Sequence, residues 1–95
     1  MAAYLIVDVD IKDQKGFEEY RQAVGPTVAQ YGGKAIVRNG RFEVLEGDWT
    51  PKSIAVLEFP SMDAIKRWYN SPEYKPLIAQ RQAVSSATLV AVEGI

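Results

Sequence analysis

The chain has 95 residues, a net charge of -1 and neither cysteine nor histidine. This length makes one small domain, and a near-neutral charge without a basic cluster excludes a nucleic-acid-binding surface and a cationic membrane-binding helix. Without His or Cys the chain lacks the usual nucleophile pairs and the usual zinc and haem ligands, so we expect no metal and no cofactor.

The first predicted element is a strand over residues 3–10, where apolar and polar side chains alternate with period two. One face of this strand carries Leu5, Val7 and Val9. The other face carries Tyr4, Ile6, Asp8 and Asp10. The two aspartates interrupt the apolar start and no basic segment precedes it, so we expect no secretory signal and no membrane span. The expected location is therefore the cytoplasm.

A helix is expected after Asp13, because apolar side chains then recur at spacings of three and four. The face that they form consists of Phe17, Tyr20, Val24 and Val28. Pro26 lies within this span and must either kink the helix or split it. Tyr31-Gly32-Gly33 is expected to end the helix, because glycine readily adopts the left-handed backbone of a helix C-terminus.

The next segment reads as a pair of strands. Ala35 to Arg38 is the predicted second strand, and Asn39-Gly40 is a strong signal for a two-residue hairpin turn. Arg41 to Glu46 is therefore predicted as the returning strand. The alternative is a bulge inside one long strand. Gly47 to Pro51 is a loop by its composition.

The second half begins with a central strand over Ser53 to Phe59, which is apolar on both faces. Ser61 then caps a helix on which Trp68 is expected to pack into the core. Ser71-Pro72 is expected to start a further helix, whose first turn is loosened by Pro76. Thr88 to Glu93 is the last predicted strand.

This order of elements predicts an α+β fold in a single domain over residues 1–95. It fits best a ferredoxin-like, split βαβ antiparallel sheet with its helices on one face. The helix-covered face is expected to carry Leu5, Val7, Val9, Ala55, Leu57 and Phe59. The opposite face is expected to carry Tyr4, Ile6, Ile36, Ile54, Val56, Leu89 and Ala91.

The opposite face is too apolar to remain in water. At about 25 cal/mol per Å² of apolar surface, several exposed aliphatic side chains represent several kcal/mol of possible burial. A second copy placed sheet to sheet, as an isologous homodimer, is the simplest cover. The alternative is that the faces of the strands are wrongly assigned.

Several short motifs along the chain resemble one family. They are Tyr31-Gly32-Gly33, Arg38, Val44-Leu45-Glu46-Gly47-Asp48-Trp49, Leu57-Glu58-Phe59-Pro60-Ser61, Ala64, Trp68-Tyr69, Ser71-Pro72-Glu73-Tyr74 and Val92-Glu93-Gly94. Together they are similar to domain-of-unknown-function family 1330 (DUF1330), over nearly the whole chain. The resemblance implies a dimeric α+β barrel and a sheet-to-sheet homodimer. It implies no particular reaction.

The candidate catalytic residues are Asp8, Arg38 and Glu58, which by strand alternation share one cavity between the two sheets. There Arg38 can hold an anionic substrate while a desolvated carboxylate with a raised pKa serves as a base. The competing interpretation is that these side chains form interface ion pairs that only fix the register of the dimer.

Further candidates for ligand binding are aromatic or acidic. Glu46 ends a strand before a glycine, where it either lines a pocket mouth or accepts hydrogen bonds in a turn. Trp49 lies in a predicted loop, where it can form part of a lid, contact a partner or pack over the edge of the sheet. Tyr69 and Tyr74 flank Ser71-Pro72, and their hydroxyls either face a pocket or bind backbone. Arg81 is expected in a surface or interface ion pair.

Two functions follow as hypotheses. The first is a homodimeric barrel that binds a small organic molecule between the sheets, with or without cofactor-independent isomerase- or oxygenase-like chemistry. The second is a non-catalytic stress-response or interaction module in which the same charges only lock the dimer. In neither is a nucleic acid or a membrane a partner.

Overall fold

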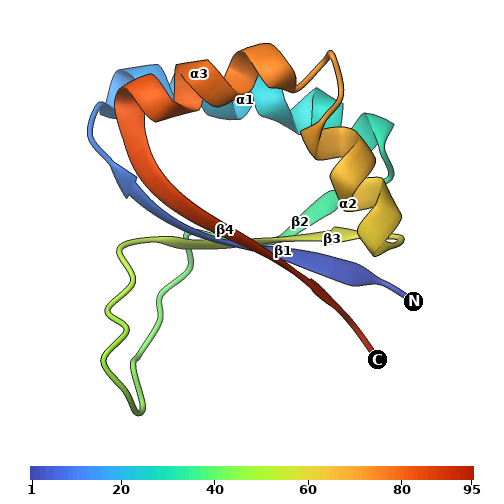
Figure 1. Cartoon of the computed structure of the whole chain (residues 1–95). Coiled ribbons are helices and arrows are strands. Elements are labelled where there is room, and N and C mark those ends of the chain that lie inside the picture. Colours follow the sequence, from blue (N-terminus) through green and yellow to red (C-terminus); the bar gives the residue numbers. More distant parts are fainter.

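A computed structural model describes all of residues 1–95. Its elements follow the order β1 (Ala3–Ile11), α1 (Gln14–Gln30), β2 (Lys34–Arg38), β3 (Ile54–Phe59), α2 (Met62–Tyr69), α3 (Lys75–Val84) and β4 (Ser85–Glu93). The four strands form one antiparallel sheet in the order β2-β3-β1-β4, and all the helices lie on one face of it (Figure 1). This confirms the predicted α+β, ferredoxin-like architecture. None of the helices is long and apolar enough to cross a lipid bilayer.

The helix α1 begins and ends where the sequence indicates. Asp13 is its N-cap and accepts a hydrogen bond from the Gly16 N–H. The helix runs through Pro26 without being split. It ends at the predicted glycine stop, where Gly32 has a φ of 82° and the Gly33 N–H donates to the Val28 carbonyl at 2.9 Å. The chain therefore turns back toward the sheet at this point.

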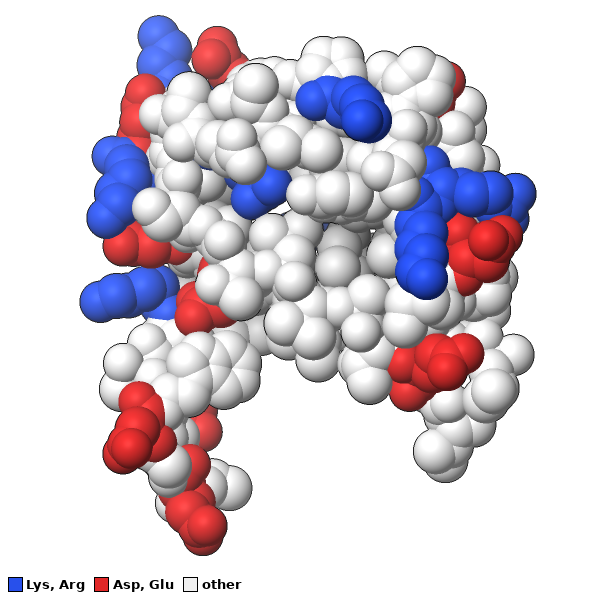
Figure 2. All heavy atoms as spheres, in the orientation of Figure 1, with Lys and Arg blue, Asp and Glu red and all other residues white.

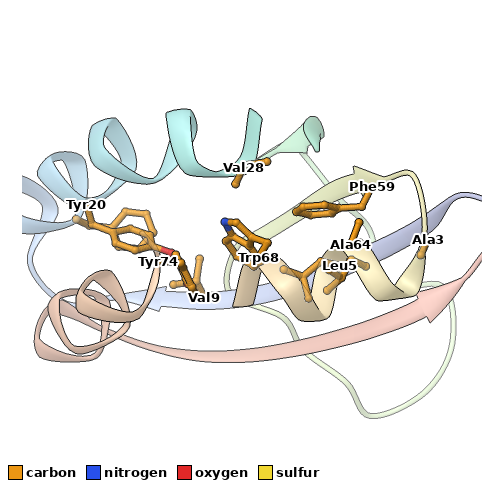
Figure 3. Packing of buried hydrophobic residues seen from close by; sticks show 11 residues of the cluster. Ala3, Leu5, Val9, Tyr20, Val28, Phe59, Ala64, Trp68 and Tyr74 are labelled. Atoms are coloured by element: carbon orange, nitrogen blue, oxygen red, sulfur yellow. The ribbon is translucent and has the colours of Figure 1, made fainter. Parts of the chain in front are cut away.

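The core lies between the helices and the sheet. Its largest fully buried side chains are Phe59, Trp68 and Tyr74 (Figure 3). The Trp68 ring stacks on the Tyr74 ring at 4.0 Å between centroids, and its Nε1–H donates to Thr27 Oγ1 at 3.0 Å. The prediction that Trp68 packs into the core is thus confirmed. Ser61 also caps α2 as predicted, accepting from the Ala64 N–H.

The helix α3 starts later than the sequence predicted. Ser71 does not cap it; instead the Ser71 hydroxyl accepts from the Tyr74 N–H at 3.1 Å, within a separate turn. The helix begins at Lys75, with Pro76 in its first turn. The expected loosening before Pro76 is therefore present, as a turn that precedes the helix.

The strand register assigns each side chain to a face. Leu5 pairs with Leu57 and Val7 with Ala55, so the helix-covered face of β1 and β3 is as predicted. The prediction for β4 was wrong. Leu89 pairs with Val7 and lies on the helix-covered face together with Ala91, while Val90 and Val92 take the open face. Both sets are apolar, so the pattern of hydrophobicity alone cannot choose between them.

The predicted hairpin at Asn39-Gly40 is also wrong. Residues 39–53 form a long loop, called the arm below, and no part of Arg41 to Glu46 pairs as a strand within the chain. The arm projects from the sheet on the side opposite the helices (Figure 1). At its base the Asn39 N–H donates to the Ile54 carbonyl at 2.9 Å, which closes the loop onto β3. An alternating pattern alone does not make a strand, because a strand needs a partner for its backbone.

A bulge does occur, but it lies earlier in the chain. The pairing of β2 with β3 shifts between Ala35 and Val37, so Arg38 pairs with Ala55. One extra residue in a strand reverses the faces of the residues that follow it. Arg38 therefore lies on the helix-covered face and not on the open face.

Candidate functional site

A half-open cavity of about 350 Å³ lies between α1 and the helix-covered face of the sheet. Its floor is formed by strand side chains that include Val7, Ala55 and Leu57, and its roof by α1. Trp68 and Tyr74 contribute aromatic walls. The space-filling view is hollowed at this level, between the helix layer and the sheet (Figure 2). Most of the lining is hydrophobic.

The most buried polar groups of the cavity are two tyrosine hydroxyls and one guanidinium. The hydroxyls of Tyr20 and Tyr74 form a hydrogen bond of 2.8 Å, with the two side chains pointing toward each other below α1 (Figure 3). Arg81, on α3, also lines the cavity and is only 6% exposed. Its Nε–H has no hydrogen-bond acceptor in the protein.

These groups affect one another electrostatically. Burial raises the pKa of the Tyr20 phenol far above its usual value, and the neighbouring Tyr74 adds to this effect. The Arg81 guanidinium acts in the opposite direction, because a positive charge favours the phenolate. Tyr20 is thus a neutral hydrogen-bonding group at ordinary pH and a poor base.

The charged residues that line the cavity are all cationic. Arg21, Arg38 and Arg81 border it, and so does Lys34, although the Lys34 ammonium group pairs with Glu58 on the open face; no Asp or Glu belongs to the lining. Arg21 is paired with Glu18 at 3.1 Å and Lys34 with Glu58 at 3.4 Å. Arg38 and Arg81 take part in no ion pair, so the cavity carries an excess of positive charge.

The predicted site residues are divided between the two faces of the sheet. Arg38 and Tyr74 line the cavity. Asp8 and Glu58 lie on the open face, where they pair with Ile54 and Lys34 respectively in the strand register. Within one chain, therefore, Asp8 and Glu58 do not share a cavity with Arg38. The expected grouping of these three residues is wrong, because the bulge in β2 turns Arg38 away from the open face.

The two candidate carboxylates on the open face, Asp8 and Glu58, already have partners in the chain. Asp8 accepts from the Lys52 N–H at 2.9 Å and from Trp49 Nε1–H at 3.0 Å, and these bonds lower its pKa. Glu58 accepts from the Tyr4 hydroxyl at 3.1 Å, which raises the pKa of that phenol. A carboxylate that serves as a base needs a raised pKa, and the Asp8 pKa moves in the opposite direction.

The remaining candidates lie away from the cavity. Glu46 is exposed on the arm and makes no hydrogen bond or ion pair. Trp49, also on the arm, is 58% exposed and is tied only to Asp8. Tyr69 is 38% exposed and packs its ring against Trp68 and Tyr74 without lining the cavity.

Arg81 is a further residue that lies elsewhere than predicted, because a surface or interface ion pair was expected for it and it is buried without one. A signal was present. Arg81 recurs at helical spacing with Leu77, Ile78 and Val84, which are partly buried against the core. An arginine on the apolar face of a helix is unusual unless its charge has a purpose or a partner.

Solved structures share this fold. The protein RPA0582 of unknown function from Rhodopseudomonas palustris matches with a TM-score of 0.80 and 21% identity, covering 99% of this chain and 82% of that one. SnoaB, described as a cofactor-independent oxygenase from Streptomyces nogalater, matches with a TM-score of 0.65 and 14% identity, covering 99% and 93%. A dimeric ferredoxin-like protein of unknown function from Jannaschia sp. CCS1 matches with a TM-score of 0.66 and 13% identity, covering 99% and 100%.

At these identities the structures show a common fold and no common activity. A comparison with curated proteins finds no match. The family described as "Domain of unknown function (DUF1330)" matches residues 2–95, which is nearly the whole chain. The chain therefore belongs to the DUF1330 family.

Proposed function

We propose that the protein binds a small organic molecule in the cavity between α1 and the sheet. The observation that carries this proposal is the cavity itself, with its volume of about 350 Å³ and its mostly apolar lining. Ligand sites are typically concave, about 300–1,000 Å³ in volume and apolar, with a few polar groups that orient the ligand. Tyr74 and Arg38 are the predicted ligand-binding residues that lie in this cavity.

This site differs from the expected one between two sheets. The change also affects the chemistry, because Asp8 and Glu58 lie on the other face and cannot take a proton from a ligand held below α1. The proton-transferring groups that remain in the cavity are the paired hydroxyls of Tyr20 and Tyr74. Because burial keeps Tyr20 neutral, binding is the activity that this cavity supports best. Oxygenase chemistry, which one structural neighbour is described as performing, is supported here only by the shared fold.

Gly25 offers a direct test of the site. It lies in the α1 wall of the cavity, and a Cβ added there would meet nothing within 4 Å. We expect Gly25→Leu to fill the cavity and to weaken binding of the neutral dye anilinonaphthalene by at least about tenfold. Gly25→Ala adds the Cβ alone and should bind like the wild type. It also controls for the restricted backbone before Pro26.

Binding is measured by quenching of Trp68 fluorescence in a Trp49→Phe background, so that the signal comes from the cavity wall. Saturable quenching that is lost in Gly25→Leu and kept in Gly25→Ala supports the proposal. Equal affinity in both variants would place the dye elsewhere, and an absence of quenching in the parent protein would contradict a ligand site in this cavity.

We further propose that the protein works as a homodimer joined through the open face of the sheet. Val90 and Val92 are 53% and 44% exposed on this face, and they lie beside Ile6, Ile54 and Val56. Leu45, on the arm that projects from the same side, is 90% exposed. A contiguous apolar patch of this kind is typical of an interface, and one structural neighbour is described as a dimer.

The alternative function, a non-catalytic interaction module, has its own support in the open face. Asp8 holds the base of the arm, and Glu58 is engaged by Tyr4 and Lys34. These contacts fit a structural role for both carboxylates, and they are compatible with ligand binding on the other side of the sheet. The cytoplasmic location stays a prediction.

A further inference from the structure

We propose that the ligand of the cavity carries an anionic group of the carboxylate kind and that Arg81 binds this group. The inference rests on the proposed ligand site below α1. It adds the chemical class of the ligand, an apolar molecule with one acidic group, and it names the residue that recognises the acid.

The first support is the burial of an unpaired charge. Arg81 is 6% exposed, forms no ion pair, and its Nε–H has no acceptor in the protein. A buried charge without a partner destabilises a fold, so buried arginines are found almost always with a carboxylate or a set of acceptors. Here the guanidinium borders a cavity instead of a carboxylate. The guanidinium also interacts with the Tyr20 hydroxyl, which is neutral and leaves the positive charge without a counter-ion. A ligand that brings an anion would supply this counter-ion.

The second support is the supply of hydrogen-bond donors beside Arg81. In the bond between the hydroxyls of Tyr20 and Tyr74, one hydroxyl donates to the other, and the second hydroxyl still has a proton to donate. That proton has no acceptor in the protein. The inner part of the cavity thus offers a guanidinium N–H and a phenol O–H, which are the groups that a carboxylate accepts from.

The third support is the charge of the whole lining. Arg21 and Lys34 are paired with Glu18 and Glu58, which lie outside the lining, whereas Arg38 and Arg81 are balanced by no acidic side chain. Arg38 is exposed and unpaired at the β2 wall, where it adds to the same positive potential. An anionic ligand is favoured by this field, and a cationic ligand is disfavoured.

The shape of the site restricts the class further. A single buried guanidinium presents a planar fork that matches a carboxylate, and its one positive charge balances one negative charge. The rest of the lining, including the rings of Phe17 and Trp68, is apolar and suits a hydrocarbon or aromatic body. The ligand class is therefore an aromatic or aliphatic monoacid.

Two dyes with the same ring skeleton test this inference. Anilinonaphthalene is neutral, and anilinonaphthalenesulfonate adds one anionic group that stands in for the carboxylate. We expect the wild type to bind the sulfonate at least about tenfold more tightly than the neutral dye, because a charge-assisted hydrogen bond contributes on this scale. In Arg81→Met the ratio of the affinities for the sulfonate and the neutral dye should fall to near one, while the neutral dye still binds.

Arg67→Met is the matched control, because Arg67 lies on α2, outside the cavity lining, where it pairs with Asp63. It should leave the ratio unchanged. Arg81→Lys keeps the charge without the planar fork, so the affinity ratio should fall severalfold. If Arg81→Met does not fold, Arg81→Lys tests whether Arg81 binds the anionic group. A thermal melt establishes folding in each case.

The two proposals fail in different ways. If neither dye quenches Trp68 in the Trp49→Phe background, the ligand site below α1 is wrong. If the neutral dye binds in a manner that Gly25→Leu abolishes, but the ratio is near one in the wild type or is unaffected in Arg81→Met, only the role of Arg81 is wrong. The assignment to Arg81 would also be overturned if Arg38→Met abolished the preference for the sulfonate dye and Arg81→Met did not.

Discussion

Asp8 joins the first strand to the arm through two hydrogen bonds, from the Lys52 N–H and from the Trp49 indole. These bonds lower the pKa of its carboxyl, the backbone bond from Lys52 having the larger effect. A carboxyl whose pKa is lower in the folded state stabilises the fold fully above the pKa of the unfolded chain, near 4. This contribution is lost as the pH falls through the lower, folded pKa.

We therefore predict that Asp8→Asn lowers the free energy of unfolding at pH 7, and that its difference from the wild type becomes smaller as the pH falls below about 4. Urea unfolding of both proteins at pH 7 and at pH 3, at one protein concentration, measures the two differences. Asp48→Asn is the control, because Asp48 is an exposed arm residue without a hydrogen bond or ion pair. A deficit that is equal at both pH values would contradict the role given to Asp8.

Single residues also show where the sequence is sufficient and where it is not. Alternation placed Asp8 and Glu58 on the open face correctly, because both lie in regular strands. It failed for Arg38, because a bulge two residues earlier reversed the face and nothing in the local sequence marks that bulge. Arg81 was misplaced for another reason: charge suggested a surface position, and burial without a partner is visible only in three dimensions.

At the scale of elements, the stop of α1 is strongly specified by the chain. Gly33 follows the helix at a point where a Cβ would lie 2.7 Å from both Phe59 and Val28 side-chain atoms. The helix end and the start of β2 can pack closely only because this position has no side chain. The sequence predicted the stop from backbone conformation, and the structure adds this steric reason.

We predict that Gly33→Ala destabilises the protein by about 1–3 kcal/mol, which is the usual cost of forcing an extra carbon into a packed core. Gly40→Ala is the matched change, because its Cβ would meet only Val37 at 3.9 Å. It should alter the free energy of unfolding by less than about 0.5 kcal/mol. Urea unfolding compares the two variants. Equal destabilisation would show that loss of glycine itself, and not the packing at Gly33, matters.

The arm is the element that the sequence could not predict. Asn39 does have the left-handed backbone that a turn residue favours, with a φ of 55°. The residues after it alternate as a strand would, but within one chain they have no strand to pair with. The alternating pattern therefore favours a strand in this segment, but it does not determine whether another strand lies beside it to form the hydrogen bonds. In the proposed dimer, a second chain beside the open face would supply contacts for its apolar side chains.

The whole molecule is a thin slab with Cα extents of 36 × 34 × 16 Å, and its helices cover only one side. The proposed ligand cavity lies in the covered layer, and the proposed interface lies on the open one. The arm, which carries Glu43, Glu46 and Asp48, extends beyond the slab and is acidic toward its end (Figure 2). The proposed ligand binding and the proposed assembly therefore involve opposite faces of one sheet, and each can be tested without altering the other.

Assembly through the open face leads to a prediction for Val90→Lys. Val90 is 53% exposed in one chain, so a lysine there can reach solvent and the single chain should still fold. In a sheet-to-sheet dimer the same lysine would be buried without a partner, at a cost of several kcal/mol. The dissociation constant of the dimer should therefore rise by more than about a hundredfold.

Ala83→Lys is the control, because it adds the same charge to an exposed position on α3 and should leave assembly unchanged. Sedimentation velocity at micromolar concentration distinguishes the species: we expect dimers for the wild type and Ala83→Lys, and monomers for Val90→Lys. A monomeric wild type would refute the interface, and a dimeric Val90→Lys would move the interface away from the open face.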